Sequence, residues 1–252
     1  VHINAGAAAL ALALVLGKRV GFQKGINKPH SVPLVMLGAS ILWFGWFGFN
    51  GGAEAAWAYA DGTYGSLTAD GTLLGTIVVN TLGATAASII GWLVVEKIKD
   101  GKATSVGAAS GAVAGLVAIT PACAFLDPGW GLLLGVLAGV LCALAVELKF
   151  KLGFDDSLDV VGIHLVGGLI GTLYLGFFAK ETGLIFSGSL AQLAVQAIAA
   201  VGVMVYSFVV AYIIGFAIQK TMGFRVKNED EIAGIDLVVH GEEGYVLADQ
   251  KA

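Results

Sequence analysis

Residues 128–146 read PGWGLLLGVLAGVLCALAV and contain no charged side chain. Six other windows also lack Asp, Glu, Lys and Arg, namely 1–17, 29–53, 71–95, 103–126, 160–179 and 182–219. A helix needs about 20 consecutive apolar residues to cross a bilayer, and most of these windows reach or approach that length. The sequence therefore predicts an all-α integral membrane protein, folded as a polytopic helical bundle.

The composition of the 252 residues excludes several other classes of protein. Hydrophobic residues make up 57% of the chain and charged residues only 13%, whereas soluble domains carry about 25% charged residues. A formal net charge of -4 offers no basic surface to a nucleic acid. Cys123 and Cys142 lie in apolar runs without metal-ligand spacing, so they are expected to pack as small hydrophobic side chains. We expect neither an enzyme nor a bound metal or cofactor.

The positive charges lie in alternate gaps between the windows. Twelve of the 14 Lys and Arg residues occupy one set of gaps and the segment directly after the last window, and Lys180 alone occupies the other set. Lys and Arg are enriched in cytoplasmic loops, so the first window is expected to run inward and the C-terminus to be cytoplasmic. We expect a multi-pass protein of the cell membrane, with a transmembrane domain over 1–224. The acidic tail over 225–252 either lies on the cytoplasmic face or is disordered.

Glycines recur at helical spacing within three of the windows. Such stripes allow helix backbones to approach closely in lipid, where packing replaces the hydrophobic driving force. They predict tight helix packing rather than phosphate binding. The three sets are Gly107, Gly111 and Gly115; Gly131, Gly135 and Gly139; and Gly167 and Gly171.

Two of the four histidines, His2 and His164, lie in predicted spans, whereas His30 lies in a loop and His240 in the tail. His2 is followed by Gly6 and His164 by Gly168, so both segments read apolar-His-x-x-x-Gly. An ionisable group inside a membrane is costly and is a candidate for function, although a buried structural histidine is the alternative. The charge pattern gives the two helices opposite directions. Related segments of opposite direction indicate an inverted repeat, whose substrate path lies near the repeat axis.

An aromatic stripe occupies the window 29–53. Leu42, Trp46, Phe49 and Ala53 fall at spacings of four, three and four residues, which places them on one helix face. Such a stripe faces lipid or a protein core more often than a pore. The residues alone leave these alternatives open.

A run of carboxylates precedes His164. Asp155, Asp156 and Asp159 lie where they can cap the following helix and favour its dipole. At about 1.5 Å per helical residue, His2 would lie about 24 Å from Lys18, but His164 only about 7 Å from Asp159. For the histidines to meet, either the first helix projects beyond the membrane or Asp159 lies in a water-filled vestibule.

With these segments in view, the chain resembles the ammonium transporters (Amt/MEP, with the Rh proteins as relatives). The matching stretches are Val1–Ala5, Gly45–Gly51, Gly115–Ala122 and Asp155–His164, together with the tail from Arg225 to Tyr245. They cover essentially the whole chain, in the family's order.

The resemblance implies an inverted-repeat fold of eleven helices, assembled as a homotrimer with one pore per subunit. This chain would then hold the end of helix five and helices six to eleven, as a fragment that begins within a span. By the same resemblance His2 and His164 are the twin pore histidines and Phe49 is one of two phenylalanines at the outer mouth. Trp46 and Val160 are wall residues. A PII-type regulatory protein is the implied partner on the cytoplasmic face.

One residue departs from the family pattern. Ala53 stands where several family members carry a serine that contacts the cation. An alanine cannot accept that hydrogen bond, so the outer site of this chain is expected to bind ammonium differently.

An apolar pore with two neutral imidazoles fits ammonium chemistry. A bare cation is costly in a low-dielectric lumen, so ammonium is expected to lose a proton at the outer mouth and to cross as ammonia. One imidazole can donate to the other and still accept from the substrate. Two alternatives remain open. An ammonium sensor would use the same site, and a membrane protein could instead ligate haem iron through two histidines.

Overall fold

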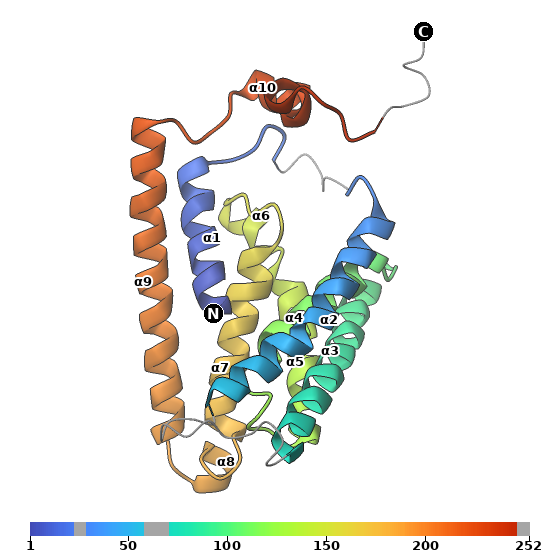
Figure 1. Cartoon of the computed structure of the whole chain (residues 1–252), viewed down its shortest axis with the longest axis vertical. Helices are drawn as coiled ribbons and strands as arrows, with labels where there is room; N and C mark the ends of the chain where they lie inside the picture. Colours follow the sequence, from blue (N-terminus) through green and yellow to red (C-terminus); the bar gives the residue numbers. More distant parts are fainter. Residues whose placement is uncertain (23–28, 58–70, 246–252) are drawn as a thin grey trace.

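The computed structural model describes residues 1–22, 29–57 and 71–245, and all regular structure in these ranges is helical (Figure 1). The long elements are α1 (His2–Leu16), α2 (Val32–Trp57), α3 (Gly71–Asp100), α4 (Ser105–Ile119), α5 (Pro128–Ala145), α7 (Val166–Phe178) and α9 (Ala191–Thr221). Short elements are α6 (Leu148–Leu152), α8 (Leu184–Ser187), α10 (Asn228–Ala233) and the π-helical turns η1 (Val161–Leu165) and η2 (Asp236–His240).

Each charge-free window overlaps one long helix, which confirms the polytopic all-α prediction. Among the residues that the structure describes, five helical segments are long and apolar enough to cross a membrane, and α1 and α4 are shorter apolar helices. In the window 103–126 the α-helix ends at Ile119. Thr120 still has helical backbone angles and its N–H bonds to the Leu116 carbonyl oxygen, but Pro121 has no N–H to continue the helical hydrogen bonds.

The glycine stripes pack helix against helix, as predicted. A Cβ added at Gly115 of α4 would lie 2.8 Å from Cα of Thr85 in α3, and Gly171 of α7 lies against the backbone of Ala118 in α4. Around these contacts α3, α4 and α5 form a tightly packed group, while α1 lies between α9 and η1. The absence of a side chain at the glycines is what allows the backbones to approach this closely.

The Lys-rich loops and the C-terminal segment share one end of the bundle, called the basic end below. In Figure 1 it lies at the top, where α10 lies above the loop that follows α1. The Val20 N–H donates to Oε1 of Glu231 at 2.8 Å, and Glu231 also pairs with Arg225. The segment after α9 is therefore tied to the bundle through Glu231.

Candidate functional site

The structure brings the two predicted histidines together. The ring centroids of His2, at the start of α1, and His164, in η1, are 5.9 Å apart, and the rings are tilted by 45°. Figure 1 shows that α1 begins part-way along the bundle, so the pair lies within its depth. His2 is 8% exposed, and Nδ1 of His164 is buried without a hydrogen-bond partner. Over the described residues, no hydrogen bond joins the two imidazoles.

Two aromatic side chains of α2 surround His2. The indole of Trp46 stacks on the imidazole with centroids 5.2 Å apart and planes only 14° from parallel. Phe49 approaches the imidazole edge-on at 5.9 Å and lies 5.5 Å from Trp46. Trp46 is buried, whereas Phe49 is 45% exposed. Trp46 and Phe49 of the predicted stripe therefore face His2, and a pore-lining role for the stripe stays a prediction.

Two glycines hold the histidine helices at close range. Gly6 of α1 packs against the backbone of Leu165, and a Cβ added at Gly168 would lie 3.0 Å from both N and Cγ1 of Ile3. Leu165 and Ile3 each directly follow the histidine of their own helix. The contacts are therefore reciprocal, as an inverted repeat requires.

The backbone around His164 is a π-helical turn rather than the regular helix that the sequence predicted. The Val161 N–H donates to Oδ2 of Asp156 at 2.7 Å, which confirms Asp156 as a cap. A Cβ added at Gly162 would lie 2.7 Å from Cγ1 of Val146, so this turn is pressed against α5. Single π-turns occur often at functional sites, since they change the direction of one side chain.

A second contact joins the end of α1 to the segment before η1 at the basic end. The Arg19 guanidinium donates to both carboxylate oxygens of Asp155, at 2.7 and 2.9 Å, and the Arg19 backbone N–H donates at 2.7 Å. Burial alone would raise the pKa of Asp155, but these hydrogen bonds outweigh it and hold the pKa below its ordinary value. The loop before η1 is therefore fixed to the end of α1 by a charged, bidentate contact.

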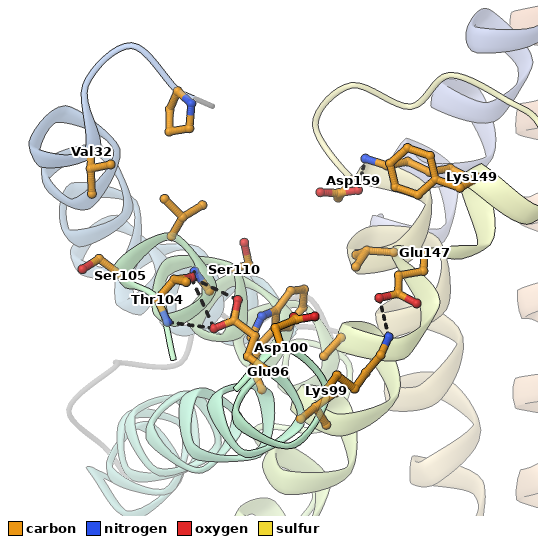
Figure 2. Close-up of a pocket in the computed structure, with 18 residues that line it drawn as sticks. Val32, Glu96, Lys99, Asp100, Thr104, Ser105, Ser110, Glu147, Lys149 and Asp159 are labelled. Atoms are coloured by element: carbon orange, nitrogen blue, oxygen red, sulfur yellow. Dashed lines mark hydrogen bonds and ion pairs between the residues drawn. The ribbon is translucent and has the colours of Figure 1, made fainter. Parts of the chain in front are cut away.

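A cavity of about 650 Å³ opens at the basic end, between the ends of α2, α3, α4 and α5 (Figure 2). Figure 2 shows two ion pairs on its wall, Lys99 with Glu147 and Lys149 with Asp159. Burial raises the pKa of Asp159, and the neighbouring Lys149 offsets part of this effect. Both lysines of the cavity are thus engaged by carboxylates.

The distance conflict in the sequence assumed a regular helix before His164. Residues 154–159 are not helical, with a turn at 157–158 and a positive φ of 59° at Asp159, so the rise of about 1.5 Å per residue does not apply to them. Asp155 bonds to Arg19 beyond the end of α1, and Asp159 lines the cavity. A water-filled vestibule around Asp159 stays a prediction. Val160 lies half-buried directly before η1, and its role as a wall residue stays a prediction.

Sequence reasoning missed a residue next to this site. The Trp46 Nε1–H donates to Oγ1 of Thr120 at 2.9 Å. Thr120 lies in the stretch 115–122 that carried the resemblance, and this was the available signal. The contact itself could not be read from the sequence because the two residues are 74 positions apart.

Helices that can cross a membrane, with the buried His2 and the half-buried His164 between them, define a multi-pass membrane protein with a polar site inside an apolar bundle. The model of the Ammonium Transporter Family matches residues 1–245. The chain belongs to the ammonium transporter family.

Individual relatives agree with the family match. The ammonium transporter of Mycobacterium tuberculosis is 51% identical over 260 residues, which cover 98% of this chain and 52% of that protein. The ammonium transporter Amt1 of Archaeoglobus fulgidus is 40% identical over 250 residues, or 97% of this chain and 60% of that protein. The crystal structure of Candida albicans Mep2 has a TM-score of 0.79 at 33% identity, covering 91% of this chain and 51% of that one. The chain thus spans about half the length of the relatives it matches.

Proposed function

We propose that this chain contributes a twin-histidine site to a pore for ammonium and ammonia. The observation that carries the proposal is the contact of His2 with His164 between apolar helices, with Trp46 stacked on one of the two rings. An intramembrane ionisable pair requires a functional reason, because its burial is costly. Family membership supplies the substrate class.

In this mechanism ammonium loses a proton near Phe49, and ammonia then passes the two imidazoles. The proton either stays with the water at the outer mouth or is relayed along the imidazoles. The rings are 5.9 Å apart and share no hydrogen bond in the described structure, so a relay between them needs an ammonia or water molecule, or a small closing movement. Neutral imidazoles suit this task because each offers one N–H donor and one acceptor nitrogen. The unpartnered Nδ1 of His164 is a position for such a guest.

The setting of the pore follows from the charges. We place the basic end, with its Lys-rich loops and α10, in the cytoplasm, in agreement with the excess of positive charge there. The same face is our proposed docking surface for a PII-type regulator, and the assembly is proposed to be a homotrimer surrounded by membrane lipid.

An ammonium sensor is the second candidate. A solved structure described as a sensor Amt protein has a TM-score of 0.81 to this chain at 30% identity, covering 96% of this chain and 58% of that one. Transporter and sensor would share the histidine site and differ in whether substrate passes. A haem protein is disfavoured, because Trp46 and Phe49 occupy two sides of His2.

The test uses a chimaera in which this chain replaces the matched half of the Mycobacterium tuberculosis ammonium transporter. Ammonium flux into liposomes should be saturable, and His164→Ala should lower it strongly but measurably, whereas Gly202→Ala at an open position of α9 should leave it unchanged. Ammonium binding without flux would favour the sensor. If flux in His164→Ala equals that of the wild type, the histidine pair is not part of the pathway.

A further inference from the structure

His2, Trp46 and Phe49 form a cluster of rings, called the His2 cluster below. Among the described residues, one contact of this cluster has a fixed direction, namely a hydrogen bond from Trp46. His2, Trp46 and Phe49 touch one another through ring faces and edges, which constrain distance more than rotation. The Trp46 N–H, by contrast, donates to Oγ1 of Thr120 at 2.9 Å. A hydrogen bond of this length fixes the direction of the indole.

Thr120 is itself held firmly. Its hydroxyl donates to the carbonyl oxygen of Leu116 at 2.7 Å, one turn earlier in α4. The single hydroxyl proton is therefore committed, and the oxygen is oriented to accept from Trp46. Because α4 ends at Ile119, Thr120 lies at the rim where the helix gives way to the turn. The accepting oxygen thus belongs to the rigid helix end.

The position of Thr120 also indicates what would follow if the hydroxyl were removed. Thr120 lines a cavity of about 500 Å³ together with Ala53, which lies on the same α2 face as Trp46. An indole without its acceptor could turn its N–H toward water in this cavity. The plane stacked on His2 would then change, since indole and imidazole lie within 14° of parallel.

We infer that Thr120 is a positioning residue that orients the His2 imidazole through Trp46. The chain of contacts runs from the end of α4, through the indole of α2, to the histidine of α1. The inference rests on the proposed function for its relevance to transport, but the geometry that it asserts can be tested on the chain alone.

The first experiment records ring signals of the full chain in detergent, with ¹⁵N-labelled tryptophan and histidine. Trp46→Phe and His2→Gln assign the two signals. Thr120→Val removes the hydroxyl at constant shape, and Thr120→Ser keeps it. We expect Thr120→Val to speed hydrogen exchange of the Trp46 N–H about fivefold to tenfold and to shift the His2 ring signals. Thr120→Ser should keep both near wild type, and the distant His30 and His240 should not move in any variant.

A coupled pair of variants separates positioning from packing. In a Trp46→Phe background the hydrogen bond is already absent, so adding Thr120→Val should not move the His2 signals further. Trp46→Phe alone should shift the His2 ring signals in the same direction as Thr120→Val. If Thr120→Val does not fold, Trp46→Phe still tests whether the indole orients the His2 ring. An unmoved His2 in folded Thr120→Val, or a further shift in the double variant, overturns the inference.

The second experiment measures flux in the chimaera described above. Thr120→Val should lower the maximal ammonium flux about fivefold to tenfold with little change in the half-saturating concentration, and Thr120→Ser should restore it. A chimaera without any flux would refute the proposed function and leave the ring-signal result standing. Unchanged flux in Thr120→Val, with active wild type, would refute the role of Thr120 in transport.

Discussion

Replacing Gly168 with alanine should move the two histidine helices apart. The added Cβ would lie 3.0 Å from the backbone nitrogen of Ile3 and 3.3 Å from Cβ of His2, whereas ordinary contact begins at 3.4 Å. The shortfall is about 0.4 Å. A backbone nitrogen cannot turn aside as a side-chain tip can, so α1 as a whole must retreat. Overpacking of this kind costs about 1–3 kcal/mol.

Two matched variants isolate this effect. Alanine is favoured over glycine within a helix by about 1 kcal/mol. At Gly202 an added Cβ would have no heavy atom within 4 Å, so Gly202→Ala measures this helix propensity without a clash. Gly91→Ala adds a clash between α3 and α5, since its Cβ would lie 2.7 Å from the Val136 carbonyl oxygen, and neither helix carries a histidine of the pair or Thr120. We expect Gly168→Ala and Gly91→Ala to lower the free energy of unfolding by about 1–3 kcal/mol relative to Gly202→Ala.

The assay is helicity during SDS titration, combined with the ¹⁵N signals of His2. Only Gly168→Ala should change both the unfolding free energy and the ring signals, and Gly91→Ala should change the free energy alone. If Gly168→Ala matches Gly202→Ala in both measurements, the close contact between α1 and α7 does not hold the site. If Gly91→Ala moves the His2 signals equally, the site responds to any loosening of the bundle and not to this contact.

Three further predictions concern the histidines, the basic end and the tail. In the chimaera, flux in the double variant of His2 and His164 should fall little below that of the worse single variant, since network members are non-additive, and strictly multiplicative losses would contradict a shared role. The pKa of Asp155 is depressed in the folded state, so its stabilisation is present above its unfolded pKa of about 3.9 and is lost as pH falls through the folded value. Asp155→Asn should therefore cost about 1–3 kcal/mol at pH 7 and flatten the acid limb of stability, and an unchanged acid limb would exclude this carboxylate as its source. Deleting 225–252 from the chimaera should weaken binding of a PII-type protein in a pull-down, and undiminished binding would remove the tail from the docking face.

Composition and hydropathy were sufficient to predict the helices. A segment that lacks charges over a bilayer's thickness has few alternatives to a helix, because its backbone groups must be paired internally. The early end of α4 was predictable in principle from Pro121. The π-turn at His164 was not, because it depends on Asp156 bonding the Val161 N–H and on α5 pressing against Gly162.

The candidate site was predictable as residue types and not as geometry. His2, Trp46 and Phe49 were identified from their spacing and from the family resemblance, and the structure places them in mutual contact. The hydrogen bond that the sequence led us to expect between the imidazoles is not seen, because hydrogen bonding depends on ring rotation that no sequence pattern records. The contact of Thr120 with Trp46 was not predicted either, because the two residues are 74 positions apart in the sequence.

The short pattern apolar-His-x-x-x-Gly acquires a physical meaning in the folded chain. Gly6 packs against Leu165, and Gly168 packs against Ile3. Each glycine thus contacts the residue that follows the histidine of the other segment, so the two copies of the pattern together fix the distance between the helices. Backbone contact does not determine how an imidazole is rotated, and in this site rotation depends on the stacked indole of Trp46 and on its bond to Thr120. Position and orientation of His2 therefore have separate sources. For this reason Gly168→Ala should displace the ring at a cost in stability, whereas Thr120→Val should rotate it while the helices stay in place.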